Sequence, residues 1–215
     1  MHLIMFDVDG TLVDSTSFDE DCFLKAAEIL FGTEISSDWD SYEYATDIGI
    51  LSETIERYEI PGDKIELVQK FRKIFLELIS GYINVNPGSV QEITGASDFI
   101  KELIQREDCR VAIATGGWEE TAKLKLKAAD IDITGCSFAS SSDHYSREGI
   151  MGKAESMAYD GIPFDSKIYF GDALWDKKAC ESLNYRFILI GDRFEHEESI
   201  QDYSEKDDLF AMLGL

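Results

Sequence analysis

The first residues of the chain change abruptly from apolar to polar. Residues 3–6 (LIMF) form a short apolar run, and residues 7–11 (DVDGT) follow it directly. The run is too short for a buried helix and predicts a strand of a parallel sheet that is covered on both faces. Because side chains alternate along a strand, Asp7 and Asp9 would lie on the same side of the chain. Two carboxylates at the end of a buried strand need a cation or hydrogen bonds, so this segment predicts a metal-dependent acidic site.

Residues 16–86 have the spacing of amphipathic helices and contain no strand pattern. Apolar residues recur at helical spacing over 18–30, a second helical region runs roughly over 39–58, and a third helix covers 63 to about 82. Proline-glycine pairs at 61–62 and 87–88 mark turns. We therefore expect residues 16–86 to form an all-helical cap, inserted after the first strand.

From residue 89 onward, short apolar runs alternate with helical patterns. The expected strands are 110–114, 137–139, 167–170 and 186–190. The expected helices cover about 95–107, 118–129 and 173–183, and a further helix begins near Lys153. Strand–helix alternation predicts an α/β fold with a doubly wound parallel sheet, whose core would comprise residues 1–15 and 87–215.

The composition narrows the classes of partner. The chain has 43 acidic and 20 basic residues and a formal net charge of -23. Such a chain would be repelled by nucleic acids and anionic membranes, so neither is an expected partner. Neither a signal peptide nor an apolar stretch long enough to cross a membrane is visible, and we expect a cytoplasmic protein with no obligate protein partner. The four cysteines are widely spaced, as expected for free thiols.

Four polar segments fall where the active edge of such a sheet would lie. The pair Asp7 and Asp9 follows the first strand, and the sequence Thr-Gly-Gly at 115–117 follows the strand 110–114. Lys153 lies near the expected start of a helix, and the sequence GDALWD at 171–176 follows the strand 167–170. Each segment alone has a plain structural explanation as a turn, a helix cap or a solvated charge. Their common position at one edge is what indicates a function.

The order and chemistry of these segments resemble the haloacid dehalogenase superfamily of phosphatases and phosphotransferases. The family pattern is an aspartate pair followed by threonine, then serine or threonine, then lysine, then an acidic pair such as GDxxxD. The resemblance covers essentially the whole chain, including a helical cap after the first strand as in the phosphoglycolate phosphatase and β-phosphoglucomutase branch. It implies a Mg²⁺-dependent phosphatase that acts on a small phosphorylated metabolite.

The resemblance also implies roles for the acidic residues. Asp7 would be the nucleophile that forms an aspartyl-phosphate, and Asp9 would act first as an acid and then as a base. Carboxylates of Asp7 and Asp172 and the backbone carbonyl of Asp9 would hold Mg²⁺, a hard cation that prefers oxygen ligands. Asp176 lies one helical turn beyond Asp172 and would support the metal site from an outer shell, as would Thr11.

The substrate phosphate would be bound by three further groups. These are the hydroxyl of Thr115, the backbone N–H of Gly116 near a helix N-terminus, and the charge of Lys153. Many relatives follow this lysine with proline, whereas here Ala154 follows it. Arg147 and Lys177 are therefore rival sources of the positive charge, although the default expectation for Arg147 and His144 is a position on the surface.

Several alternatives remain open at this stage. Asp9 argues against dehalogenation, because true haloacid dehalogenases lack the second aspartate. A phosphosugar mutase shares the same core, and nothing local in the sequence separates it from a phosphatase. A phosphorylated signalling receiver is disfavoured by the order of the acidic segments, and a non-catalytic phosphate-binding protein is disfavoured because all expected groups are present. Trp118 and Trp175 flank two of the motifs, where core packing is the expected role of both.

Overall fold

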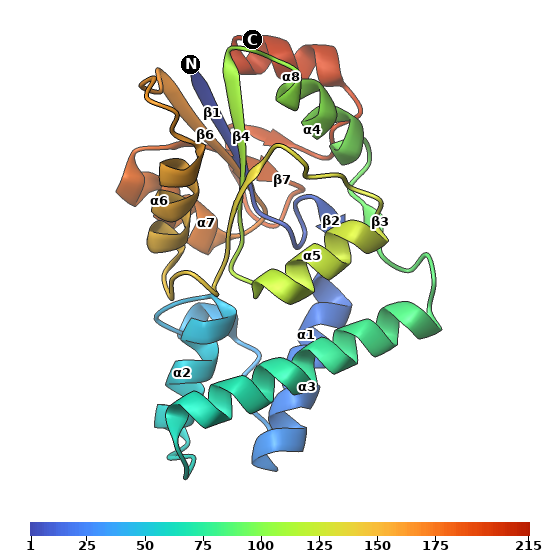
Figure 1. Cartoon of the computed structure of the whole chain (residues 1–215), viewed down its shortest axis with the longest axis vertical. Coiled ribbons are helices and arrows are strands. Elements are labelled where there is room, and N and C mark those ends of the chain that lie inside the picture. Colours follow the sequence, from blue (N-terminus) through green and yellow to red (C-terminus); the bar gives the residue numbers. More distant parts are fainter.

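A parallel sheet of six strands forms the centre of the computed structural model, which describes all residues from 1 to 215 (Figure 1). The strands lie side by side in the order β5-β4-β1-β6-β7-β8, and every neighbouring pair is parallel. The predicted doubly wound α/β fold is thereby confirmed. The strands are β1 (His2–Phe6), β4 (Cys109–Ala114), β5 (Ser137–Ala139), β6 (Ser166–Gly171), β7 (Arg186–Ile190) and β8 (Ser199–Ile200).

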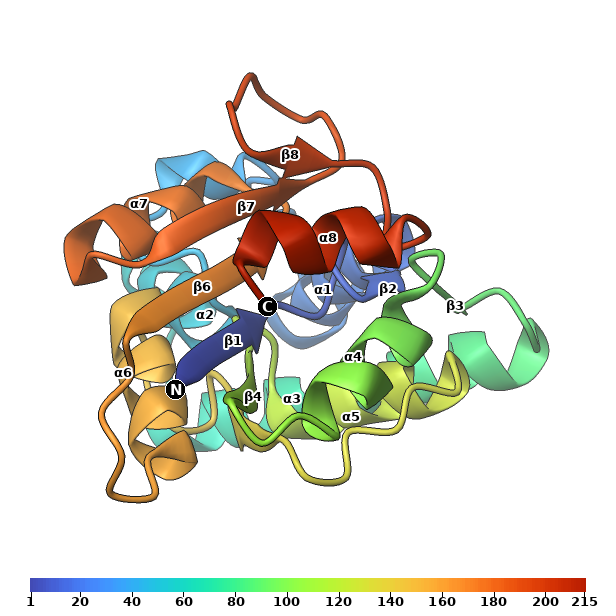
Figure 2. The ribbon, with the colours of Figure 1, turned by 90° about the horizontal axis from the view of Figure 1, so that it is seen from above.

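Helices cover both faces of this sheet (Figure 2). Ile4 and Phe6 of β1 point into the larger hydrophobic cluster, whereas Leu3 and Met5 point into a second cluster on the opposite face. This alternation follows from the two-residue period of a strand. Because both faces of the strand are covered, every position of the run is apolar. The larger cluster includes side chains from α4 (Ala96–Ile104), α5 (Glu119–Ala128) and α8 (Lys206–Leu213), and the second includes side chains from α6 (Arg147–Ala158) and α7 (Leu174–Leu183).

A helical segment, here called the cap, lies at the carboxyl end of the strands (Figure 1). It is inserted between the two short strands β2 (Val13–Asp14) and β3 (Gln91–Glu92), which pair antiparallel. The chain thus leaves and re-enters the core at one place. The cap comprises α1 (Thr16–Phe31), a 3₁₀ turn η1 (Trp39–Ser41), α2 (Asp47–Arg57) and α3 (Lys64–Val85).

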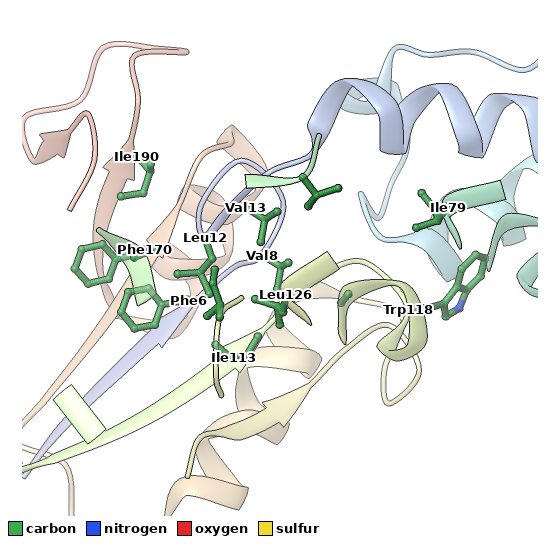
Figure 3. Packing of buried hydrophobic residues seen from close by; sticks show 14 of the residues in the cluster. Phe6, Val8, Leu12, Val13, Ile79, Ile113, Trp118, Leu126, Phe170 and Ile190 are labelled. Atoms are coloured by element: carbon green, nitrogen blue, oxygen red, sulfur yellow. The ribbon is translucent and has the colours of Figure 1, made fainter. Parts of the chain in front are cut away.

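Trp118 joins the cap to the sheet core. It precedes α5 and is only 2% exposed, and in Figure 3 it lies beside Ile79 of α3. Its ring centroid lies 5.8 Å from that of Phe71 and 5.9 Å from that of Phe75. The larger hydrophobic cluster therefore continues from the sheet into the cap, and separating the two would expose aromatic surface.

The structure differs from the predicted elements in three ways. The second helical region is divided into η1 and α2, and the very short strands β2, β3 and β8 and the final helix α8 had not been predicted. The third difference concerns α6, which begins at Arg147, six residues before the expected start. None of the helices is long and apolar enough to span a membrane.

Candidate active site

Three buried aspartates meet at the carboxyl end of the central strands. Asp7 directly follows β1, Asp172 directly follows β6, and Asp176 lies in the first turn of α7. Each offers a carboxylate oxygen within 4.8 Å of the others. Their exposed fractions are 2%, 6% and 0%. The adjacency of β1 and β6 in the sheet brings together residues that are about 165 positions apart in the sequence.

Two glycines provide the space for these carboxylates. A Cβ atom on Gly10 would lie 2.2 Å from Oδ2 of Asp172, and Gly10 also has a positive φ of 75°. A Cβ atom on Gly171 would lie 2.7 Å from Oδ2 of Asp176. Both positions exclude a side chain because the backbone approaches a carboxylate too closely.

The aspartate cluster carries more negative charge than its neighbours compensate. Burial, followed by the charge of Asp7, raises the pKa of Asp172 to about 7, although Arg193 Nη1 lies 2.8 Å from its Oδ2. Burial likewise raises the pKa of Asp176, even though Arg147 opposes this shift. Buried carboxylate oxygens that lack sufficient countercharge match the donor set that Mg²⁺ prefers, so the cluster could hold this ion.

The cation that contacts Asp7 is Arg147. Its Nη1 lies 3.1 Å from Oδ1 of Asp7 and 3.1 Å from Oδ1 of Asp176. The Arg147 side chain is only 10% exposed, and its Nε has no hydrogen-bond partner. A Cβ atom on Gly116 would lie 2.8 Å from Nη2 of Arg147, so glycine is required there for the guanidinium to fit.

Lys153 is not brought to this site. It is exposed on α6 and does not line the pocket that contains Asp7. The expectation that Lys153 lies at the active edge was wrong, as was the expectation that Arg147 lies on the surface. The cause is the start of α6: Ser146 accepts a hydrogen bond from Gly149 N at 3.2 Å and caps the helix. Arg147 is therefore the first residue of the helix, and Lys153 lies almost two turns further along.

The second aspartate of the pair is held by a lysine that the sequence did not single out. Lys125 of α5 is 1% exposed, and its Nζ lies 2.5 Å from Oδ1 of Asp9 and 2.7 Å from Oδ1 of Asp19 in the cap. The Ser15 hydroxyl donates a hydrogen bond to the same oxygen of Asp9. Burial alone would lower the pKa of Lys125, but Asp19 and Asp9 raise it above its usual value.

One signal in the sequence could have identified Lys125. It lies between Ala122 and Leu126 on the buried face of α5, at a helical spacing that predicts an apolar residue. A lysine at such a position needs a carboxylate partner, because an unpaired buried ammonium is costly. Which carboxylate it would meet depends on the packing of α5 against the loop after β1.

The pocket above these groups lies between the sheet edge and the cap. Asp7, Asp9, Thr115, Gly116 and Asp172 all line it, so five of the predicted site residues share one pocket. Apart from Lys153, the predicted residues outside the pocket are Thr11 and Asp176, which are both fully buried. The backbone oxygen of Thr11 accepts a hydrogen bond from the Tyr203 hydroxyl at 3.2 Å, which ties the loop after β1 to the core.

The loop that follows β4 forms one wall of the pocket. Oγ1 of Thr115 accepts a hydrogen bond from Gly117 N at 3.1 Å. The cap contacts the same loop, because Asp47 N donates to Gly116 O at 2.8 Å and Trp118 N donates to Asp47 Oδ2 at 2.8 Å. The N-terminus of α2 is therefore fixed directly over the phosphate-binding residues that the sequence predicted.

Trp175 does not have the packing role that was expected of it. It is only partly buried and lines the same pocket beside Asp172. Its Nε1 is buried without a hydrogen-bond partner. The core-packing role expected of Trp118, in contrast, is confirmed by its burial among the aromatic side chains of the cap.

Solved structures with the same fold are known. A hydrolase from Pseudomonas syringae has a TM-score of 0.71 at 19% identity, with 97% of this chain and 99% of that chain covered. CbbY from Rhodobacter sphaeroides, in complex with phosphate, has a TM-score of 0.70 at 17% identity, covering 94% and 95%. YfnB from Bacillus subtilis, bound to magnesium, has a TM-score of 0.55 at 17% identity, covering 100% and 99%. At these low identities, the structural similarity shows a shared fold and no more.

A family profile provides the assignment that structural similarity alone does not. No curated protein matches the sequence significantly. The profile of haloacid dehalogenase-like hydrolases matches residues 4–190, which is most of the chain and includes every segment that contributes to the pocket except Arg193. The chain, with its helical cap inserted after the first strands, therefore belongs to the haloacid dehalogenase-like hydrolase family.

Proposed function

We propose that this protein is a Mg²⁺-dependent phosphatase that hydrolyses a small phosphomonoester through an aspartyl-phosphate on Asp7. The observation that carries the proposal is a buried group of four charged side chains. Asp7, Asp172 and Arg147 line the pocket, and Asp176 lies behind them in contact with Arg147. This group combines a carboxylate that can attack phosphorus with carboxylates that can hold a cation and with an arginine. Phosphoryl transfer requires such a nucleophile and positive charge near the phosphoryl oxygens.

Asp7 and Asp9 have distinct roles in this reaction. An oxygen of Asp7 attacks phosphorus, the bond to the leaving oxygen breaks, and Asp9 gives its proton to that oxygen. Asp9 then takes a proton from a water molecule, which attacks the aspartyl-phosphate and releases inorganic phosphate and free Asp7. Lys125 and Ser15 bind Oδ1 of Asp9 and so leave Oδ2 for the proton transfers.

Binding of the phosphate rests on the groups around Asp7. Asp7 and Asp172, the backbone carbonyl of Asp9 and, by its position, Asp176 would hold the ion, which when bound neutralises negative charge on the phosphoryl oxygens. Thr115 and the N–H of Gly116 would donate to the phosphate. Arg147 takes the role predicted for Lys153, because it alone joins a buried positive charge to Asp7.

The test is phosphate release from a panel of phosphorylated sugars, nucleotides and small acids, with Mg²⁺ and with a chelator. We expect release that depends on Mg²⁺ and is abolished by Asp7→Asn, since the amide is nearly isosteric but a poor nucleophile. Asp172→Ala is expected to weaken Mg²⁺ binding in a calorimetric titration. Substantial activity of Asp7→Asn would remove Asp7 from this role. Interconversion of a sugar phosphate primed by a bisphosphate, without release, would instead indicate a mutase.

A further inference from the structure

The side of the pocket formed by the cap is acidic. Three carboxylates of the cap line it, from Asp19 and Glu20 in α1 and from Asp47 at the start of α2. No lysine or arginine of the cap lines the pocket. A phosphomonoester whose phosphate lies against Asp7 would direct its leaving group toward these residues, because the cap covers the carboxyl end of the strands.

Each of these carboxylates is fixed through one of its two oxygens. Oδ1 of Asp19 contacts Lys125 at 2.7 Å, Oε2 of Glu20 accepts from Trp39 Nε1 at 3.2 Å, and Oδ2 of Asp47 accepts from Trp118 N at 2.8 Å. The other oxygen of each has no protein donor. Asp47 is only 9% exposed as a whole residue, and it lines the pocket.

The cations of the pocket are already committed to other carboxylates. Arg147 is paired with Asp7 and Asp176, and Arg193 with Asp172. Lys125, which lies behind the pocket, is paired with Asp9 and Asp19. The cap itself supplies no cation to balance a second anionic group on a substrate, and such a group would lie near the carboxylates of Asp19 and Glu20.

We propose that the substrate is a phosphomonoester whose leaving group carries hydroxyl or amino donors and no second anion. The proposal rests on the phosphatase function above and specifies its substrate class. Hydroxyl and ammonium groups can donate to the free oxygens of Asp19, Glu20 and Asp47, whereas a carboxylate or a second phosphate cannot. The cap therefore selects against sugar bisphosphates, and this disfavours a mutase that must bind a bisphosphate intermediate.

Three two-carbon phosphomonoesters form a matched test. They are 2-hydroxyethyl phosphate, phosphoethanolamine and phosphoglycolate, which differ in ending with a hydroxyl, an ammonium or a carboxylate group. We expect kcat/KM to be at least about tenfold higher for each of the first two than for phosphoglycolate, which corresponds to about 1.4 kcal/mol. Comparison of the first two shows whether the donor is hydroxyl or ammonium. An equal or higher value for phosphoglycolate would overturn the proposal.

Variants of the cap carboxylates test whether their negative charge causes the discrimination against phosphoglycolate. In a protein carrying both Glu20→Gln and Asp47→Asn, each amide oxygen can still accept the existing hydrogen bond while the charge is lost. The discrimination against phosphoglycolate is expected to shrink toward equality in this variant. Asp21→Asn is the matched control, because Asp21 is exposed on the same helix and does not line the pocket. Unchanged discrimination in the double variant would refute the assignment to these carboxylates.

Binding distinguishes this proposal from the phosphatase function itself. The three ligands would be titrated into the Asp7→Asn protein with Mg²⁺ by calorimetry, where turnover is not required. Tighter binding of the hydroxyl or ammonium ligand than of phosphoglycolate supports the proposed substrate class. Failure of the native protein to hydrolyse p-nitrophenyl phosphate would refute only the phosphatase function. Tightest binding of phosphoglycolate, or no binding of any ligand at millimolar concentration, would overturn the substrate class.

Discussion

Among single residues, Arg147 has the largest consequence for the site. One nitrogen, Nη1, contacts both Asp7 and Asp176, while Nε has no partner and Nη2 approaches Gly116. The guanidinium can therefore hold Asp7, the proposed nucleophile, and still offer donors to a phosphate, because its N–H groups point in fixed, different directions. A lysine ammonium has no such fork, so the two residues would not be equivalent at this position.

Substitution of Arg147 tests this role. We expect Arg147→Met to lower kcat/KM by about 100-fold, since it removes a preorganised donor at developing negative charge. Arg147→Lys should retain the positive charge and restore part of the activity. Lys153→Met is the matched control on the same helix and should remain within about twofold of the native protein.

Steady-state kinetics together with circular dichroism would distinguish loss of chemistry from loss of fold. If Lys153→Met were as impaired as Arg147→Met, the proposal that Arg147 has the role predicted for Lys153 would be wrong.

Among the elements, α5 has a central place because its Lys125 reaches two other segments. It joins the loop after β1 through Asp9 and the cap helix α1 through Asp19. Burial raises the pKa of Asp19 to about 6, although Lys125 lowers it. The three charges lie in a little-hydrated region, so they depend on one another far more than a pair on the surface would.

Removal of Lys125 should therefore be costly. We expect Lys125→Met to lower the free energy of unfolding by about 3–5 kcal/mol, because Asp9 and Asp19 would be left without their partner. Lys127→Met, on the exposed side of the same helix, should change it by less than about 0.5 kcal/mol. Urea denaturation of both variants measures the difference, and equal stabilities would contradict a structural role for the Lys125 pairs.

In the whole molecule, the balance of charge determines how metal, protons and stability are connected. The formal net charge is -23, and the aspartate cluster concentrates negative charge at one end of the sheet. Without a metal, the raised pKa of Asp172, about 7, means that the folded protein holds a proton more tightly than the unfolded chain. Protons and Mg²⁺ thus compete for the same oxygens.

This competition predicts a specific pH dependence. Above pH 7, Asp172 is ionised in both states, and folding bears the full cost of burying its charge. As the pH falls through 7 toward the ordinary value near 4, the folded state gains a proton first, so stability without metal should rise. The increase in melting temperature caused by Mg²⁺ should consequently be larger at pH 8 than at pH 6.

Thermal unfolding with Mg²⁺ and with chelator at both pH values measures this effect. Asp172→Asn is the control, because it removes this titration and one oxygen ligand while leaving the remaining surface charge unchanged. A Mg²⁺ effect that is independent of pH in the native protein would contradict the link between metal and Asp172.

The order of elements could be predicted because each one has a local pattern. The apolar run before Asp7 and the helical spacing in the cap are properties of neighbouring residues, and both match the structure closely. The two-residue strands β2, β3 and β8 have no periodicity to detect, since their pairing depends on partners distant in the chain. The start of α6 was misplaced because its cap, Ser146, lies in a polar loop with several residues of similar type.

The sequence by itself determined that Asp7, Asp9, Thr115 and Asp172 belong to one site, because each follows a strand whose carboxyl end lies at the same edge of a parallel sheet. Only the tertiary structure decided which cations accompany them. Arg147 rather than Lys153 meets Asp7 because α6 begins early, and Lys125 meets Asp9 across 116 positions because α5 packs against the first loop. The physical reason is that hydrophobic periodicity is a local property, whereas charge pairing depends on distances that only packing sets.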